Sequence, residues 1–103
     1  MERKRGIELQ DILGIKSPEN VAEDLLARMR KRRKQMKMSR ARLAQLSGVK
    51  EPTIRVAETK GKVSLIHLLK MAMVLECLTD FEEVCNKPHY QSIEEVLAAN
   101  EEH

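Results

Sequence analysis

A single glycine, Gly48, separates two short segments that each carry the pattern of an amphipathic helix. The first segment, residues 39–47, begins with Ser39, whose hydroxyl can accept a hydrogen bond from the free amides of the following helix. Gly48 suits the left-handed residue that ends many helices, because it has no Cβ to clash with the backbone. Three apolar residues are expected to form the buried stripe of this first helix: Leu43, Ala44 and Leu46.

The second segment is predicted to start a new helix at Glu51 and Pro52, where the missing N–H of proline is not needed. Val49 can fill the corner between the two helices, and Ile54 and Ala57 share one helical face. Two short helices joined by a glycine-containing turn of three to four residues have the form of the DNA-binding helix-turn-helix. The pattern therefore predicts this motif.

A resemblance to a known family covers roughly residues 22–84 and is carried by the run SRARLAQLSGVKEPTIRVAETKGKVSLIHLLKMAMVL. This run resembles the lambda-repressor-like, or Xre-type, helix-turn-helix family, and the segment SLIHLLKMAMVLECLTDFEEV is most similar to HipB-type antitoxins. The resemblance implies an all-α fold, a lambda-repressor-like bundle of about five helices, with a short additional C-terminal helix. The chain departs from the common family pattern at three positions: Arg40, Lys50 and Val56.

Further helices are predicted on both sides of the motif. Ser17 and Pro18 begin the first one, as a cap followed by a proline in the first turn. Its apolar face is expected to comprise Val21, Ala22, Leu25, Leu26 and Met29. Ser64 caps the helix that follows the motif. Its broad apolar face is expected to comprise Leu65, Leu68, Leu69, Ala72, Met73 and Leu75.

The chain is predicted to divide into three parts. Residues 1–16 form an N-terminal arm, residues 17–85 the DNA-binding domain, and residues 86–103 a C-terminal tail. Within the domain, Thr79 or Asp80 caps a last short helix, and the tail contains a capping box that predicts one more helix. The arm is either a frayed end or a basic arm that touches the minor groove of DNA.

Positive charge is concentrated around the motif. Residues 28–62 contain 13 Lys and Arg against only Glu51 and Glu58, a net charge of +11, whereas the whole chain has a net charge of +3. A run of charge is commonly a solvated helix face. A basic block that coincides with a helix-turn-helix is the electrostatic pattern of phosphate binding, which favours double-stranded DNA as the partner. RNA is disfavoured, because the two aromatic residues that could stack on bases lie outside the block.

Two sets of residues are predicted to contact DNA. The helix that begins at residue 51 enters the major groove by its N-terminal end, while the basic block holds the phosphates. The residues predicted to read bases are Lys50, Glu51, Pro52, Thr53, Arg55 and Val56. For Lys50 and Arg55 a bond to a phosphate beside the groove is the open alternative. The residues predicted to bind phosphates are Arg33, Lys37, Ser39, Arg40, Lys60 and Lys62.

These features predict a transcriptional repressor that binds a palindromic operator as a homodimer. The expected dimer surface comprises Leu78, Phe81, Val84 and Leu97, with a place wholly in the core as the equally open alternative for Phe81. The resemblance adds an antitoxin that represses its own operon and binds a cognate toxin protein. Two alternatives are an interaction module that mainly neutralises a partner enzyme and a stand-alone phage-type repressor. A bacterial cytoplasmic, nucleoid-associated location is expected.

No catalytic residues, cofactor or metal site are predicted. Cys77, Cys85 and His89 form the closest metal-like cluster, but their spacing lacks the close pair of a zinc knuckle. The two thiols are expected to be buried and to act as small hydrophobic groups. No apolar run is long enough to cross a membrane. Enzyme activity is therefore not expected.

Overall fold

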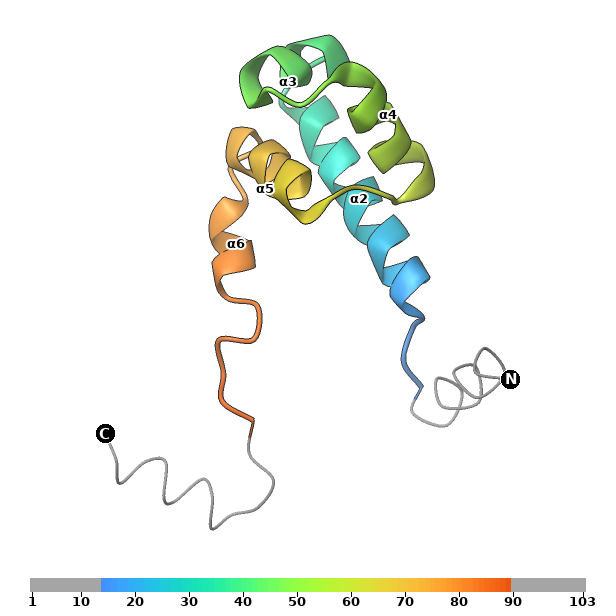
Figure 1. The fold of residues 1–103 in the computed structure, drawn as a ribbon, viewed down its shortest axis with the longest axis vertical. Coiled ribbons are helices and arrows are strands. Elements are labelled where there is room, and N and C mark those ends of the chain that lie inside the picture. The colour runs from blue at the N-terminus through green and yellow to red at the C-terminus, as the bar shows by residue number, and fades with distance from the viewer. Residues whose placement is uncertain (1–13, 90–103) are drawn as a thin grey trace.

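The computed structural model describes residues 14–89, which fold into five helices without a strand (Figure 1). The helices are α2 (Pro18–Gln35), α3 (Arg40–Ser47), α4 (Glu51–Lys60), α5 (Leu65–Val74) and α6 (Leu78–Glu82). This arrangement confirms the all-α, lambda-repressor-like bundle. The capping box of the expected C-terminal helix, Ser92 and Glu95, lies outside the described residues, as does most of the N-terminal arm.

Serine hydroxyls cap three of these helices at the predicted places. The Oγ atoms of Ser17, Ser39 and Ser64 accept hydrogen bonds from amides three residues further on, at 3.0, 3.0 and 3.2 Å. Each bond satisfies one amide that the helix itself cannot pair. The starts of α2, α3 and α5 are thus specified locally, and the predicted boundaries are confirmed.

The core lies where α2 packs on α4 and where α3 packs on both α4 and α5. Val49, in the turn between α3 and α4, is 1 % exposed and fills the corner, as predicted. Both helices of the motif contribute buried side chains to this core, and side chains of α2 and α5 pack against them. The buried apolar residues are Leu26, Met29, Leu43, Val49, Ile54, Ala57, Met71, Ala72, Leu75 and Cys77.

Four apolar residues that were expected to be buried are exposed. Val21, expected on the inner face of α2, is 50 % exposed. Leu46 is 48 % exposed, because the residue of α3 that points into the core is Leu43. Leu65 and Met73 are 68 % and 69 % exposed. On α5 the buried positions are Met71 and Ala72, followed by Leu75 at the C-cap, so the opposite side of this largely apolar helix faces solvent.

The start of α6 was predicted wrongly. The helix begins at Leu78, before the expected caps at Thr79 or Asp80, and Cys77 at the N-cap makes no side-chain capping bond. The turn before α6 is instead held by Arg32 of α2, which donates to the carbonyl oxygens of Leu75 and Glu76. A partner 43 residues away along the chain therefore sets this boundary, and no local pattern signals it.

Two glycines that end helices allow a matched prediction. Gly48 and Gly61 both adopt left-handed conformations, with φ of 78° and 68°. A Cβ on Gly61 would lie 3.1 Å from the backbone Cα of Glu23 in α2, whereas a Cβ on Gly48 would meet nothing within 4 Å. Gly61→Ala is therefore expected to lower the free energy of unfolding by about 2 kcal/mol, and Gly48→Ala by about 1 kcal/mol. Urea unfolding of both variants measures the difference, and equal losses would contradict the close approach of α4 to α2.

Candidate nucleic-acid interface

The turn between α3 and α4 has the geometry expected for a helix-turn-helix. Gly48 ends α3 in the left-handed conformation, and its amide donates to the carbonyl oxygen of Ala44 at 2.9 Å. Lys50 is the N-cap of α4 and provides no side-chain capping bond. Contacts of α3 with α4, and of α4 with α2, position the two short helices of the motif (Figure 1).

Helix α4 has one buried face and one exposed face. Ile54 and Ala57 are both 0 % exposed and point into the core. The helical repeat then places Pro52, Arg55 and Val56 on the opposite side, where all three are exposed. An exposed face on a helix that is anchored along its other side can enter a groove without unfolding the bundle.

The predicted base-reading residues lie mainly on this exposed face or at the N-terminal end of α4. Lys50 and Glu51 are exposed, and Thr53 is half-buried at the edge of the face. Val56 is 41 % exposed, next to the exposed Arg55 on the same side of the helix. The six predicted readers therefore share one end and one side of the helix.

A buried carboxylate, that of Glu58, joins three helices beneath this face. Its side chain is 1 % exposed. Arg33 of α2 donates to it twice, from Nε to Oε2 at 2.7 Å and from Nη2 to Oε1 at 3.0 Å. Arg40 at the start of α3 donates from Nε to Oε1 at 2.7 Å. The carboxylate of α4 thus fixes the positions of α2 and α3, since a bidentate arginine pair restrains both distance and orientation.

Arg33 is therefore not available as the predicted phosphate contact. The residue is 6 % exposed, and its Nη1 atom donates to the carbonyl oxygen of Met38 at 2.7 Å. A guanidinium that is buried and bonded in this way stabilises the bundle and does not reach DNA. Within the run of basic residues on α2, only the packing against α4 distinguishes this arginine from its exposed neighbours.

Glu58 stays ionised to a lower pH than an ordinary glutamate. Burial raises the pKa of its carboxyl group, but hydrogen bonds and charge from Arg33 and Arg40 outweigh burial and hold the pKa below 4.5. Arg30 adds a third positive charge, with its Nε atom 3.9 Å from Oε1 of Glu58. The cluster therefore keeps a net positive charge beside the motif.

The sequence profile of the helix-turn-helix family matches residues 29–81, more than half of the 103 residues. This chain belongs to the helix-turn-helix family. Its match, of the Xre type, spans the C-terminal end of α2, all of α3 to α5, and most of α6. The domain is accordingly a DNA-binding regulator of transcription. A search of curated proteins and a search of solved structures found no match.

The remaining predicted phosphate-binding residues of the helix-turn-helix domain lie at two places. Lys37 and Ser39 precede α3, and both are exposed, although the Ser39 oxygen already accepts the capping bond from the amide of Arg42. Lys60 and Lys62 flank Gly61 at the far end of α4, and both are exposed. Basic groups therefore stand at both ends of the helix-turn-helix unit.

Arg40 is bonded to the buried Glu58 and is also partly exposed to solvent. One of its nitrogens is engaged by Glu58, yet its side chain is 25 % exposed at the first turn of α3. It can therefore carry its charge near a phosphate while it is held in place from below. Arg42, which was not predicted, is exposed on the same turn and donates to Gln45 at 2.8 Å.

The two cysteines differ, which corrects the expectation that both are buried. Cys77 is 8 % exposed, and burial raises the pKa of its thiol, whereas Cys85 is exposed. Among residues 14–89, no three His, Cys, Asp or Glu side chains are grouped as a metal site would require. None of the helices in this range is both long and apolar enough to cross a membrane.

The predicted dimer residues that the structure describes line two grooves, and Phe81 lines both of them. Leu78 and Phe81 are half-buried and pack against the core, and together with Leu69 they line a small groove between α5 and α6. Val84, two residues after the end of α6, is 65 % exposed and lines the groove between α2 and α6. Leu97 lies outside the described residues.

Proposed function

We propose that the domain is a transcriptional repressor that reads its operator with the exposed face of α4. The observation that carries this proposal is the two-sided character of α4. One side is held by the core and by Glu58, and the other side is exposed between basic groups. The N-terminal end of α4 is proposed to enter the major groove, as recognition helices of this motif do.

Each predicted contact has a chemical role in this proposal. Glu51 can accept a hydrogen bond from a cytosine amino group, and Pro52 and Val56 can pack on a thymine methyl group. Lys50, Thr53 and Arg55 complete the reading set, with Arg55 suited to guanine or to an adjacent phosphate. The phosphate-binding set is Lys37, Ser39, Arg40, Lys60 and Lys62, from which Arg33 is removed because it is buried.

A variant pair separates reading from phosphate binding. Glu51→Ala is expected to weaken binding to a selected operator by about 1–3 kcal/mol, with little effect on random DNA. Lys62→Ala is expected to weaken binding to both duplexes alike and to lower the salt slope by about one unit. Both side chains are exposed and form no salt bridge in the described structure, so neither change disturbs the core. Fluorescence titrations on both duplexes over a salt series measure these effects. Equal weakening of both duplexes by Glu51→Ala would contradict the proposed placement of α4.

The repressor is proposed to act as a homodimer, because paired half-sites about 34–36 Å apart double the number of base contacts. Support comes from the solvent side of α5, where Leu65, Ile66 and Met73 are 58–69 % exposed. This stripe continues into the groove lined by Leu69, Leu78 and Phe81. Apolar residues gathered on one surface are typical of protein interfaces.

The dimer has its own test. The chain of 11.9 kDa is expected to scatter light as a particle of twice that mass at high micromolar concentration. Replacing Ile66 and Met73 with serine is expected to produce monomers, whereas the control Val21→Ser, at an exposed apolar position of α2, leaves the mass unchanged. A native chain that remains monomeric would contradict the proposed interface.

The resemblance to HipB-type antitoxins supports a narrower role, in which the repressor controls its own operon and binds a cognate toxin in the bacterial cytoplasm. A toxin-like protein encoded beside this chain would be the expected partner. Co-purification of the two proteins when they are expressed together tests this role, and independent elution of both proteins would contradict it.

A further inference from the structure

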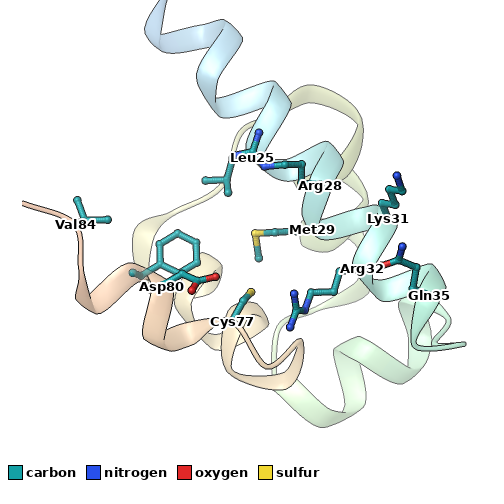
Figure 2. Close-up of a pocket in the computed structure, with 10 residues that line it drawn as sticks. Leu25, Arg28, Met29, Lys31, Arg32, Gln35, Cys77, Asp80 and Val84 are labelled. Carbon is teal, nitrogen blue, oxygen red and sulfur yellow. The ribbon is translucent and has the colours of Figure 1, made fainter.

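A second apolar groove lies between α2 and α6, away from the exposed face of α4. In Figure 1 the N-terminal half of α2 and the segment after α6 diverge from each other. Figure 2 shows Leu25 and Met29 of α2 on one side of the opening, and Cys77 and Asp80 of the α6 segment on the other. Its volume is about 610 Å³, and it is lined mainly by Leu25, Met29, Cys77, Phe81 and Val84.

The edge of this groove is positively charged along α2. Arg28, Lys31 and Arg32 line it, with Asp80 as the one acidic lining residue. Arg32 is engaged with the carbonyl oxygens of Leu75 and Glu76, so Arg28 and Lys31 remain as exposed cations beside an apolar floor. An occupant that matches this surface presents apolar side chains inward and acidic side chains toward α2.

The C-terminal tail of the same chain has this composition. Ile93, Val96 and Leu97 are spaced so that they share one face if the segment is helical, which the capping box formed by Ser92 and Glu95 favours. Residues 90–103 contain four glutamates and no lysine or arginine. The N-terminal segment, residues 1–13, is the weaker match, because Arg3, Lys4 and Arg5 balance its acidic residues.

The connection between groove and tail is short. Val84 itself lines the groove, and only residues 85–92 separate it from Ile93. Fully extended, these eight residues span at most about 26–29 Å, which limits how far Ile93 can lie from Val84. A segment tethered this closely has an effective concentration in the millimolar range, which favours its own groove over that of a second molecule.

We propose that residues 92–97 dock in the groove between α2 and α6 of the same chain, with Ile93, Val96 and Leu97 on its floor and Glu94 or Glu95 beside Arg28 and Lys31. This intramolecular contact is independent of DNA binding by α4. It assigns Val84 and Leu97, which were predicted to contact a second subunit, to a contact within one chain.

The test compares two full-length variants by amide NMR and thermal unfolding. The first replaces Ile93, Val96 and Leu97 with serine, and the control replaces Ala98 and Ala99 with serine on the other face of the same segment. The first is expected to shift the amide signals of residues 25–29 and 77–84 and to lower the unfolding midpoint by about 4–8 °C, the change that loss of one modest contact produces in a small domain. The control is expected to do neither.

A charge pair sharpens this experiment. Lys31→Glu is expected to shift the same amide signals and to lower the unfolding midpoint by the same amount. Adding Glu94→Lys and Glu95→Lys to the Lys31→Glu variant is expected to restore the signals and the midpoint at least in part. Lys70→Glu, the same change on α5, is expected to leave the groove signals unchanged. Unchanged groove signals in the first serine variant would overturn the proposal. Shifts that fade on dilution would overturn it in favour of the tail of a second copy. Groove signals that respond only to Ile12→Ser and Leu13→Ser would overturn it in favour of the N-terminal segment.

Discussion

Replacing Glu58 with glutamine is expected to lower the free energy of unfolding by about 3–5 kcal/mol, the usual loss when one partner of a buried ion pair is removed. The amide leaves Arg33, which is 6 % exposed, without a charge partner. It also replaces one of the two carboxylate oxygens, Oε2, which accepts from Arg33, or Oε1, which accepts from both Arg33 and Arg40. Small domains have total stabilities of about 5–15 kcal/mol, so such a loss leaves little margin. Urea unfolding measures it, with Glu51→Gln as control, because Glu51 is exposed and near the start of the same helix.

The free energy of unfolding of Glu58→Gln and Glu51→Gln is expected to depend differently on pH. Because the pKa of Glu58 is lower in the folded chain than the ordinary 4.5, its contribution to stability is fully present above pH 4.5 and is lost as the pH falls through the folded pKa. The native chain and Glu51→Gln are therefore expected to lose stability steeply below pH 4.5, and Glu58→Gln more gradually. Parallel curves for all three proteins would contradict the assignment of the cluster as the main acid-sensitive contact.

Ile54→Ala and Val56→Ala are expected to separate the two faces of α4. Ile54 is 0 % exposed, so its truncation should lower the free energy of unfolding by about 2–5 kcal/mol through lost burial and the cavity left behind. Val56 is 41 % exposed, so its truncation should change stability by less than about 0.5 kcal/mol and weaken operator binding instead. Each variant is measured by urea unfolding and by DNA titration. A stability loss for Val56→Ala as large as that for Ile54→Ala would show that the exposed face of α4 is packed in solution.

The motif could be predicted because its determinants are local. Ser39 caps its own helix, Gly48 adopts the left-handed conformation that its missing Cβ permits, and Val49 fills the adjacent corner. The alternation of Ile54 and Ala57 with exposed residues on α4 is also a local pattern, so the two faces of this helix followed from spacing alone.

The cluster of Glu58, Arg33 and Arg40 was not predicted, because the charge of a residue does not show which way its side chain points. Arg33 lies in a run of basic residues whose members look alike in sequence, and only the fold turns it toward α4. One signal was available. Glu58 follows Ile54 by four residues and Ala57 by one, which places an acidic side chain on the buried face of a helix surrounded by basic segments.

Helix α5 posed the opposite difficulty. Nearly all of its residues are apolar, so periodicity could not tell which side is buried, and the exposed Leu65 and Met73 were placed in the core. The contact between Arg32 and the carbonyl oxygen of Leu75 joins residues 43 positions apart, beyond the reach of any local pattern. Such long-range contacts appear only once the helices are packed.

The most direct test of DNA reading by this domain is the ratio of two dissociation constants. A duplex enriched from a random pool by the native chain is compared with a shuffled duplex of the same composition, at one fixed salt concentration. Specific regulators bind their sites about 10³–10⁷ times more tightly than other DNA, and a ratio of at least about 10³ is expected here. A ratio near one, with both affinities falling equally as salt rises, would show that the basic block binds DNA without reading it and would contradict the proposed role of α4.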